Sequence, residues 1–169
     1  AHLHNHTQFS VLQSTISVPA LVKAAIEQKM PAVAITDHAN LMGVFHFVRD
    51  IINHNKSVDA KNAAAVEKGE EPTEKPLKPI VGCEFYVVKD RTRKTFSKEQ
   101  KDERYHQVLL AKNKQGYANL VKLTSLGFIE GMYSKYPRID KELIEKYHEG
   151  LIATTCCIGA YVPQTILHD

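Results

Sequence analysis

Short apolar segments alternate along this chain with segments of helical periodicity, and this alternation constrains the fold more than any other feature. Strands are expected over residues 2–9, 32–35, 79–88, 105–111 and 151–154. Helices are expected over residues 19–29, 43–53, 117–129, 141–147 and 159–168. Short buried strands that alternate with helices are typical of an α/β fold with a parallel sheet. In such folds the functional residues lie where the strands end.

The chain has the size and composition of one globular domain. Its 169 residues are 43% hydrophobic and 24% charged, which excludes a disordered tail, a collagen-like chain and a disulfide-bonded miniprotein. We predict a single domain over residues 1–169, with an exposed insertion rich in Lys, Glu and Pro at about 55–78 that could be helical over residues 59–68, where alanines cluster. The cysteine content favours a reducing, cytoplasmic compartment, and no apolar run is long enough to cross a membrane.

The first expected strand carries an imidazole at every second position. His2, His4 and His6 would line one side of that strand, because side chains two residues apart point to the same face. Imidazole nitrogens are good ligands for zinc, iron and manganese. A partly exposed strand or the remnant of a purification tag is the alternative. It is less favoured because the run continues directly into a plausible strand and turn.

Further side chains that could bind metal lie at or near the ends of the later strands. They are Asp37 and His38 after the second strand, Glu84 in the third, His106 in the fourth, and Cys156 and Cys157 after the fifth. A carboxylate in the apolar third strand is costly unless a cation accompanies it. One of the two adjacent cysteines is expected to face the other ligands, whereas Cys83 is expected in the core. Taken alone, Asp37 could equally cap a turn, and His38 could be exposed.

Together these side chains offer more than the four ligands of one structural zinc site, which favours several metal ions. Mixed imidazole and carboxylate ligands suit the hydrolysis of phosphate esters, in which two or three ions clamp the phosphate. The remaining histidines, namely His46, His54, His148 and His168, are expected at the surface. Arg91, Arg93 and Lys94 fit a solvated loop better than a site for phosphate.

The chain resembles the N-terminal PHP (polymerase and histidinol phosphatase) domain of bacterial replicative DNA polymerase III alpha subunits. The resemblance rests on six segments in this order: HLHNHTQFS, ITDHANLMG, PIVGCEFYV, YHQVLLAKNKQGYANLVKL, PRIDKELIE and EGLIATTCCIGAYVPQ. It implies a distorted (β/α)7 barrel with a metal cluster at the C-terminal ends of its strands. PHP domains also supply a late Asp-x-His motif that these residues lack, so we expect a barrel that is C-terminally truncated in this chain.

The resemblance also assigns roles to individual residues. It implies up to three divalent ions, which could be zinc, manganese or iron. His4 and His6 would hold the first ion, His106 and Cys157 the second and His38 the third, while Glu84 would bridge two ions. Glu84 and Asp37 are the implied catalytic residues, with Asp37 as a ligand or as a support for one. His2 stands where simpler PHP enzymes have Asp, and Gln13 replaces an acidic residue, which weakens the third site.

The implied function is that of a metal-dependent phosphoesterase, acting as a 3′–5′ proofreading exonuclease. The implied parent protein is a DNA-directed DNA polymerase, which is a nucleotidyltransferase of DNA replication. The implied partners are DNA, the rest of the alpha subunit and a proofreading exonuclease subunit. Two alternatives stay open: a structural module that stabilises the polymerase without catalysis, and a stand-alone PHP phosphatase. Because the late motif is missing, we expect negligible nuclease activity from this fragment alone.

Overall fold

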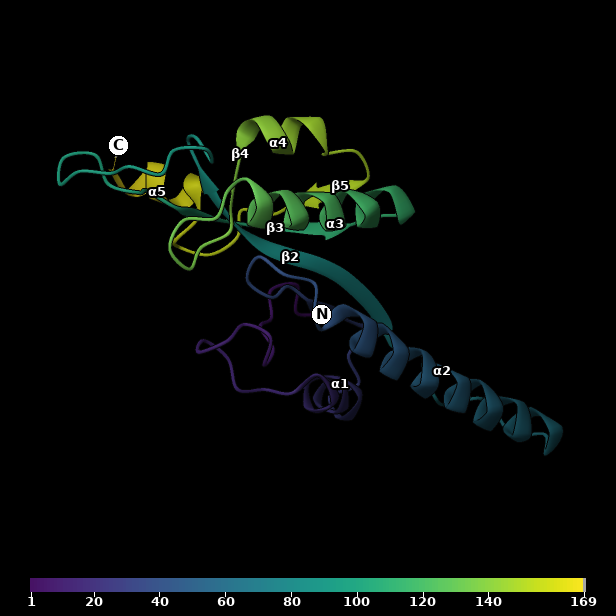
Figure 1. Cartoon of the computed structure of the whole chain (residues 1–169). Helices are drawn as coiled ribbons and strands as arrows, with labels where there is room; N and C mark the ends of the chain where they lie inside the picture. The colour runs from purple at the N-terminus through teal and green to yellow at the C-terminus, as the bar shows by residue number, and fades with distance from the viewer. Residues whose placement is uncertain (169) are drawn as a thin grey trace. The chain divides into compact units, whose positions relative to one another are not determined.

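A computed structural model describes residues 1–168 of the chain, and Figure 1 labels its helices and strands. The elements are α1 (Val18–Glu27), β1 (Ala32–Ile35), α2 (Val44–Glu67), β2 (Lys78–Val88), β3 (Tyr105–Ala111), α3 (Lys114–Ile129), β4 (Arg138–Asp140), α4 (Lys141–Lys146), β5 (Leu151–Ala153) and α5 (Tyr161–His168). Four of the five expected strands and all five expected helices are present. None of the helices within residues 1–168 is both long enough and apolar enough to cross a membrane.

Residues 2–9 do not form the strand that their alternating pattern predicts. His2 alone makes a β-bridge, to Val33 of β1. The side-chain amide of Asn5 then donates hydrogen bonds to the carbonyl oxygens of His2 and Ala34, each at 3.1 Å. Asparagine side chains offer the backbone an alternative to regular pairing in this way. The first expected strand is therefore wrong, and a bent segment takes its place.

The sheet is mixed, with the strand order β1-β2-β3-β5 and with β4 paired to β2. Strand β3 is antiparallel to β2 and to β5, whereas β4 is parallel to β2. The expectation of a parallel sheet was wrong, because residues 89–104 between β2 and β3 form no crossover helix. Within residues 1–168 the sheet is open, with β1 and β5 at its ends, so the expected (β/α)7 barrel is not confirmed.

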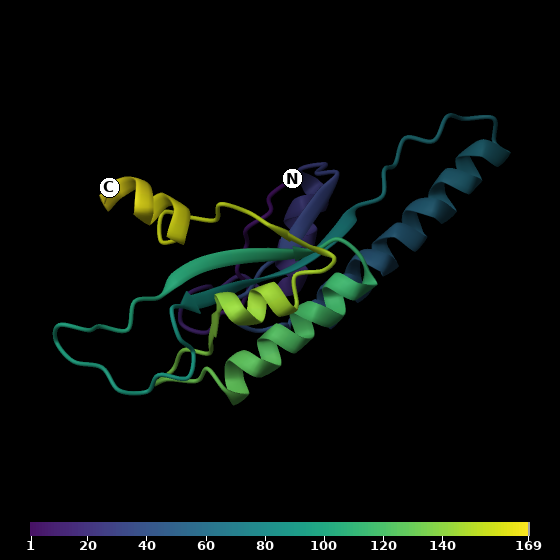
Figure 2. The ribbon, with the colours of Figure 1, turned by 90° about the horizontal axis from the view of Figure 1, so that it is seen from above.

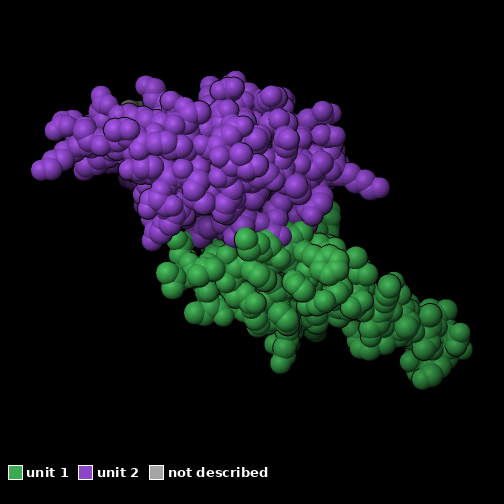
Figure 3. Space-filling model, viewed as in Figure 1, with its two compact units in different colours: residues 1–35, 42–80 green, residues 36–41, 81–169 purple. Residues whose placement is uncertain are grey.

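The chain divides into two compact units, which Figure 3 colours separately and which are described here one at a time. Unit 1 consists of residues 1–35 and 42–80, and unit 2 consists of residues 36–41 and 81–169. In unit 1, α1 packs against α2. The side chain of Ser17 caps α1 by accepting a hydrogen bond from the Ala20 amide. The buried side chains of unit 1 include Val18, Val22, Ala25, Val33, Phe47 and Ile51.

Helix α2 is longer than predicted and continues to Glu67, as its length in Figure 2 shows. Residues 54–67 contain four alanines and neither glycine nor proline, so nothing in them stops a helix. The helix ends just before Gly69, whose positive φ of 75° suits the residue that follows a helix. Asn55 then anchors the returning chain by bonding both backbone groups of Leu77 at 2.9 Å.

In unit 2, α3 packs on β3 and β4, and α4 packs on β4. The core consists of Cys83, Phe85, Leu109, Leu120, Leu123, Ile139 and Leu143, so the expected burial of Cys83 is confirmed. Asp140 caps α4 by accepting a hydrogen bond from the Leu143 amide at 3.1 Å. Gly116 of α3 approaches Gly150 so closely that a β-carbon on Gly116 would collide with the Gly150 carbonyl oxygen.

A fully buried arginine holds the connection between β2 and β3 in place. The Arg138 guanidinium donates hydrogen bonds to the Asp102 carboxylate at 2.7 Å and to the carbonyl oxygens of Arg93 and Arg91 at 2.7 and 3.1 Å. Arg91 in turn bonds the Asp140 carboxylate at 2.8 Å. The segment that charge alone predicts to be a solvated loop is therefore fixed at several points.

Candidate metal centre

Glu84 of β2 lies at the centre of a cluster of side chains in unit 2. Its side chain is 1% exposed, although a carboxylate is costly to bury. The segment after β1 lies along β2 at this point, because the Glu84 amide donates to the Asp37 carbonyl oxygen at 3.1 Å and the Ala39 amide donates to the Glu84 carbonyl oxygen at 2.8 Å. These backbone bonds place His38 directly beside Glu84.

His106 of β3 lies in direct contact with the Glu84 carboxylate. Its Nδ1 atom lies 2.5 Å from Oε1 of Glu84. The antiparallel register places Glu84 opposite Val108 and Tyr86 opposite His106, so His106 is the diagonal neighbour of Glu84 on the same sheet face. The hydrogen bond to Glu84 raises the pKa of His106 to about 9, against the opposing effect of burial.

His38 approaches the same carboxylate oxygen, with its Nδ1 atom 3.6 Å from Oε1 of Glu84. Its ring stacks on Tyr86 at a centroid distance of 5.6 Å and an interplanar angle of 7°. Tyr86 also meets the ring of His106 edge-on, at 5.4 Å. Tyr86 therefore supports both imidazoles. The period of two along a strand places it on the same face as Glu84, a signal that our sequence analysis did not use.

Asp37 is buried, with 2% of its surface exposed. Its backbone oxygen accepts the hydrogen bond from Glu84 described above, and it also lies 3.4 Å from the Cys83 sulfur. Its carboxylate belongs to none of the groups of three potential metal ligands that residues 1–168 form. The catalytic role expected for Asp37 therefore stays a prediction.

The two adjacent cysteines after β5 both face Glu84. The sulfur of Cys157 lies 3.5 Å from Nδ1 of His106, and the ligand atoms of Glu84, His106 and Cys157 all lie within 4.8 Å of one another. The sulfur of Cys156 also lies within 4.8 Å of a Glu84 oxygen. The sequence predicts that only one of the pair faces the cluster. The structure places both there because Cys156 has a left-handed backbone, with φ of 61°.

Burial raises the pKa of the Cys156 thiol to about 12. Burial also raises the pKa of Cys83, which belongs to the core. A raised thiol pKa means that both groups are protonated at neutral pH unless a cation approaches. Only Cys156 of these two lies beside Glu84 together with other potential ligands.

His4 and His6 lie together in unit 1. Their Nε2 atoms are 3.2 Å apart, and Nδ1 of His6 lies 3.1 Å from the Ser10 hydroxyl. The sequence predicts that His2 joins this pair, but His2 is exposed and contributes a backbone bridge instead. Without a strand over these residues, the alternation that would align all three rings is lost. His46, His148 and His168 are exposed, as expected, and His54 is half-buried.

The chemistry of the unit 2 cluster matches that of a metal site. It combines a carboxylate, two imidazoles and two thiols, which are the oxygen, nitrogen and sulfur ligands that bind divalent transition metals.

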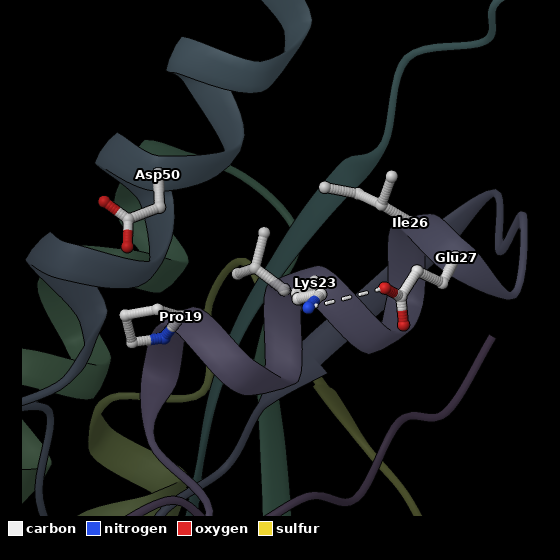
Figure 4. A pocket seen from close by; sticks show the side chains of 6 residues that line it. Pro19, Lys23, Ile26, Glu27 and Asp50 are labelled. Atoms are coloured by element: carbon white, nitrogen blue, oxygen red, sulfur yellow. Dashed lines mark ion pairs between the residues drawn. The ribbon is translucent and has the colours of Figure 1, made fainter.

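By contrast, a cavity of about 410 Å³ between α1 and α2 of unit 1 contains no histidine or cysteine. Figure 4 shows its lining, where Lys23 and Glu27 form an ion pair at 3.7 Å. The groups with metal-binding chemistry thus lie elsewhere.

Comparison with known proteins agrees with this chemistry. The PHP domain family matches residues 2–169. A DNA polymerase III subunit alpha from Borreliella burgdorferi is 41% identical over 98% of this chain, and one from Thermus aquaticus is 40% identical over all of it. The chain spans only 13% and 12% of the lengths of these two relatives. Because the family match covers essentially every residue, the chain belongs to the PHP domain family.

Proposed function

We propose that this chain is the PHP portion of a bacterial DNA polymerase III alpha subunit and that its Glu84 cluster is a metal-dependent phosphoesterase site. The proposed reaction is 3′–5′ exonuclease cleavage of DNA. The proposed partners are DNA, the rest of the alpha subunit and a proofreading exonuclease subunit. Support comes from relatives that carry the polymerase name, although the chain covers only 12–13% of their length. Polymerase activity is therefore proposed only for a longer protein.

One observation carries the proposal: a fully buried carboxylate is surrounded by ligands of two other kinds. The nitrogen of His106 and the sulfur of Cys157 lie within 4.8 Å of a Glu84 oxygen and of each other. A core needs no such group, because apolar side chains of similar volume are often more stabilising than buried charges. A bound cation gives the carboxylate, the imidazole and the thiolate a common partner.

The residues of the chain have distinct proposed roles around such ions. Bound divalent ions supply a water molecule of lowered pKa and stabilise charge on phosphate oxygens. Glu84 would hold such ions together with His106 and Cys157, whose ligand atoms lie within 4.8 Å of one another. His38, oriented by its stacking on Tyr86, serves another ion. The burial of Glu84 keeps bulk water away and so strengthens these electrostatic contacts.

The remaining assignments extend beyond the Glu84 cluster. His4 and His6, whose rings already lie together in unit 1, are the proposed ligands of a further ion. Asp37 is the proposed second catalytic carboxylate. We propose up to three ions per chain, with zinc, manganese and iron as the candidates, since the ligand types accept all three.

Counting metal ions in the purified chain tests the proposal. After growth with added zinc or manganese, elemental analysis should find at least one ion per chain. Glu84→Gln removes the charge that offsets the repulsion between two ions, so in a chain that holds two or more ions it should lower the count by more than one. The control is Glu27→Gln, at an exposed glutamate of α1, which should leave the count unchanged. A metal-free wild-type chain, or an unchanged count in Glu84→Gln, would contradict the proposal.

Cleavage is tested separately, on 3′-labelled single-stranded DNA with zinc or manganese present. The longer polymerase subunit should remove 3′ nucleotides, and Glu84→Gln in that subunit should abolish the removal. Bound metal without cleavage in the longer subunit would instead favour the structural module that stabilises the polymerase.

A further inference from the structure

The adjacent cysteines Cys156 and Cys157 present both of their sulfurs to one carboxylate. Side chains of neighbouring residues in an extended chain point to opposite faces. Here the sulfur of each cysteine lies within 4.8 Å of a Glu84 oxygen. The left-handed backbone of Cys156 makes this possible, because its φ of 61° turns the chain between the two side chains.

This conformation needs an explanation, because residues with a β-carbon rarely adopt it. A turn that only reversed the chain would favour glycine or asparagine at this position. The backbone around Cys156 is held on both sides: its amide donates to the Thr154 hydroxyl at 3.0 Å, and the Ala160 amide donates to the Cys157 carbonyl oxygen at 2.9 Å. Unfavourable backbone conformations that the surroundings enforce are concentrated at functional sites.

We propose that Cys156 is a second sulfur ligand beside Cys157 and that the two thiolates make the centre selective for zinc over manganese. This inference rests on the proposed metal-binding function of the cluster. Thiolates are soft ligands that favour zinc, whereas manganese favours carboxylates, carbonyls and water. With one thiolate among nitrogen and oxygen ligands, discrimination between the two metals is weak. A second thiolate strengthens the preference for zinc.

Cobalt substitution detects the sulfur ligands directly. Cobalt(II) bound by thiolates absorbs in the near ultraviolet through sulfur-to-metal charge transfer, and the absorbance grows with the number of sulfur ligands. Cys156→Ala should lower this absorbance to about half of the wild-type value. A second variant, Cys156→Gly, should cause the same loss, and its glycine adopts the left-handed backbone without strain. Cys157→Ala should cause a similar loss. The matched control is Cys83→Ala, because Cys83 is fully buried in the core and contacts the Asp37 carbonyl oxygen.

Competition between zinc and manganese tests the selectivity. The chain is equilibrated with both metals, and bound metal is counted after removal of the excess. Loss of a residue that only orients a ligand typically costs about 10–100-fold in metal affinity, so loss of a ligand itself should lower the preference for zinc at least about tenfold in Cys156→Ala. Cys83→Ala should keep the wild-type preference. An unchanged preference in Cys156→Ala would overturn the selectivity.

The outcomes separate this inference from the function on which it rests. If Cys157→Ala and Glu84→Gln lose metal while both Cys156 variants keep the wild-type cobalt spectrum, the second sulfur ligand is excluded and the metal centre stands. If the wild-type chain binds no metal and shows no charge-transfer band, the metal centre itself is excluded. Circular dichroism of each variant shows whether it is folded. If Cys156→Ala does not fold, the cobalt spectrum of Cys156→Gly tests the second sulfur ligand instead.

Discussion

Arg138 and Glu84 of unit 2 are both buried almost completely, and their surroundings differ. Arg138 is 0% exposed and Glu84 is 1% exposed. Arg138 donates hydrogen bonds of 2.7–3.1 Å to a carboxylate and to three carbonyl oxygens, so each of these hydrogen bonds ends on an oxygen acceptor. Glu84 instead faces imidazoles and thiols, which bind metal ions once they lose their protons.

The difference shows that burial and charge do not by themselves mark a functional site. In the Arg138 cluster, the guanidinium donates hydrogen bonds to oxygen acceptors. These bonds hold residues 89–104 in place. The Glu84 cluster gathers nitrogen, oxygen and sulfur atoms that can share one cation. The kind of atom that surrounds a buried charge therefore distinguishes a structural site from a metal site.

The largest expected effect is the loss of stability when the buried Arg138 is replaced. Arg138→Met leaves a buried carboxylate and several carbonyl oxygens without this donor, and the free energy of unfolding should fall by about 3 kcal/mol or more. Urea denaturation measures the change, with Lys141→Met as the control at an 87% exposed side chain. Metal content per folded chain should be unchanged. A stability loss below about 1 kcal/mol would show that the two clusters do not differ in this way.

The second effect is on the response of stability to metal. A hundredfold excess of metal over its dissociation constant should stabilise the wild-type chain by about 2.7 kcal/mol. Glu84→Gln should remove this gain, whereas Arg138→Met, if it folds, should retain it. Thermal denaturation with and without zinc measures both. A zinc response that survives in Glu84→Gln would place the metal ligands elsewhere.

The third effect concerns pH in the metal-free chain. The contact with Glu84 raises the pKa of His106 from 6.5 to about 9, so the protonated imidazole stabilises the folded state. This contribution is complete below pH 6.5 and is lost as the pH rises through about 9. Urea denaturation in the presence of a chelator should show stability declining across that range. His106→Ala should flatten the decline, and an equal decline in that variant would assign it to other groups.

The smallest expected effect tests the stacking of Tyr86 on His38. Tyr86→Leu keeps an apolar side chain but removes the aromatic face, which is worth about 0.5–1.5 kcal/mol. Metal affinity should therefore fall about tenfold, as is typical when a residue that orients a ligand is lost. Competition with a metallochromic indicator measures the affinity. Tyr117→Leu, at an exposed tyrosine of α3, is the control and should leave the affinity unchanged.

The sequence by itself determined the features that depend on neighbouring residues. Apolar runs and helical periodicity located β1, β3 and α4, because strand burial and helix formation depend on residues a few positions apart. The motifs around His4, His38 and Glu84 were sufficient to indicate the PHP family, which the family match confirms. The residue types that could bind metal could also be identified from the sequence, since ligand chemistry belongs to the side chain itself.

Only the tertiary structure decided the direction of the strands, the bend at residues 2–9 and the position of the Cys156 sulfur beside Glu84. It also revealed Arg138, which no sequence pattern distinguished from the other basic residues. These features depend on contacts between distant residues: Arg138 meets Asp102 36 positions away, and Cys157 meets His106 51 positions away. Local periodicity carries no information about such partners, because the folded backbone alone brings them together.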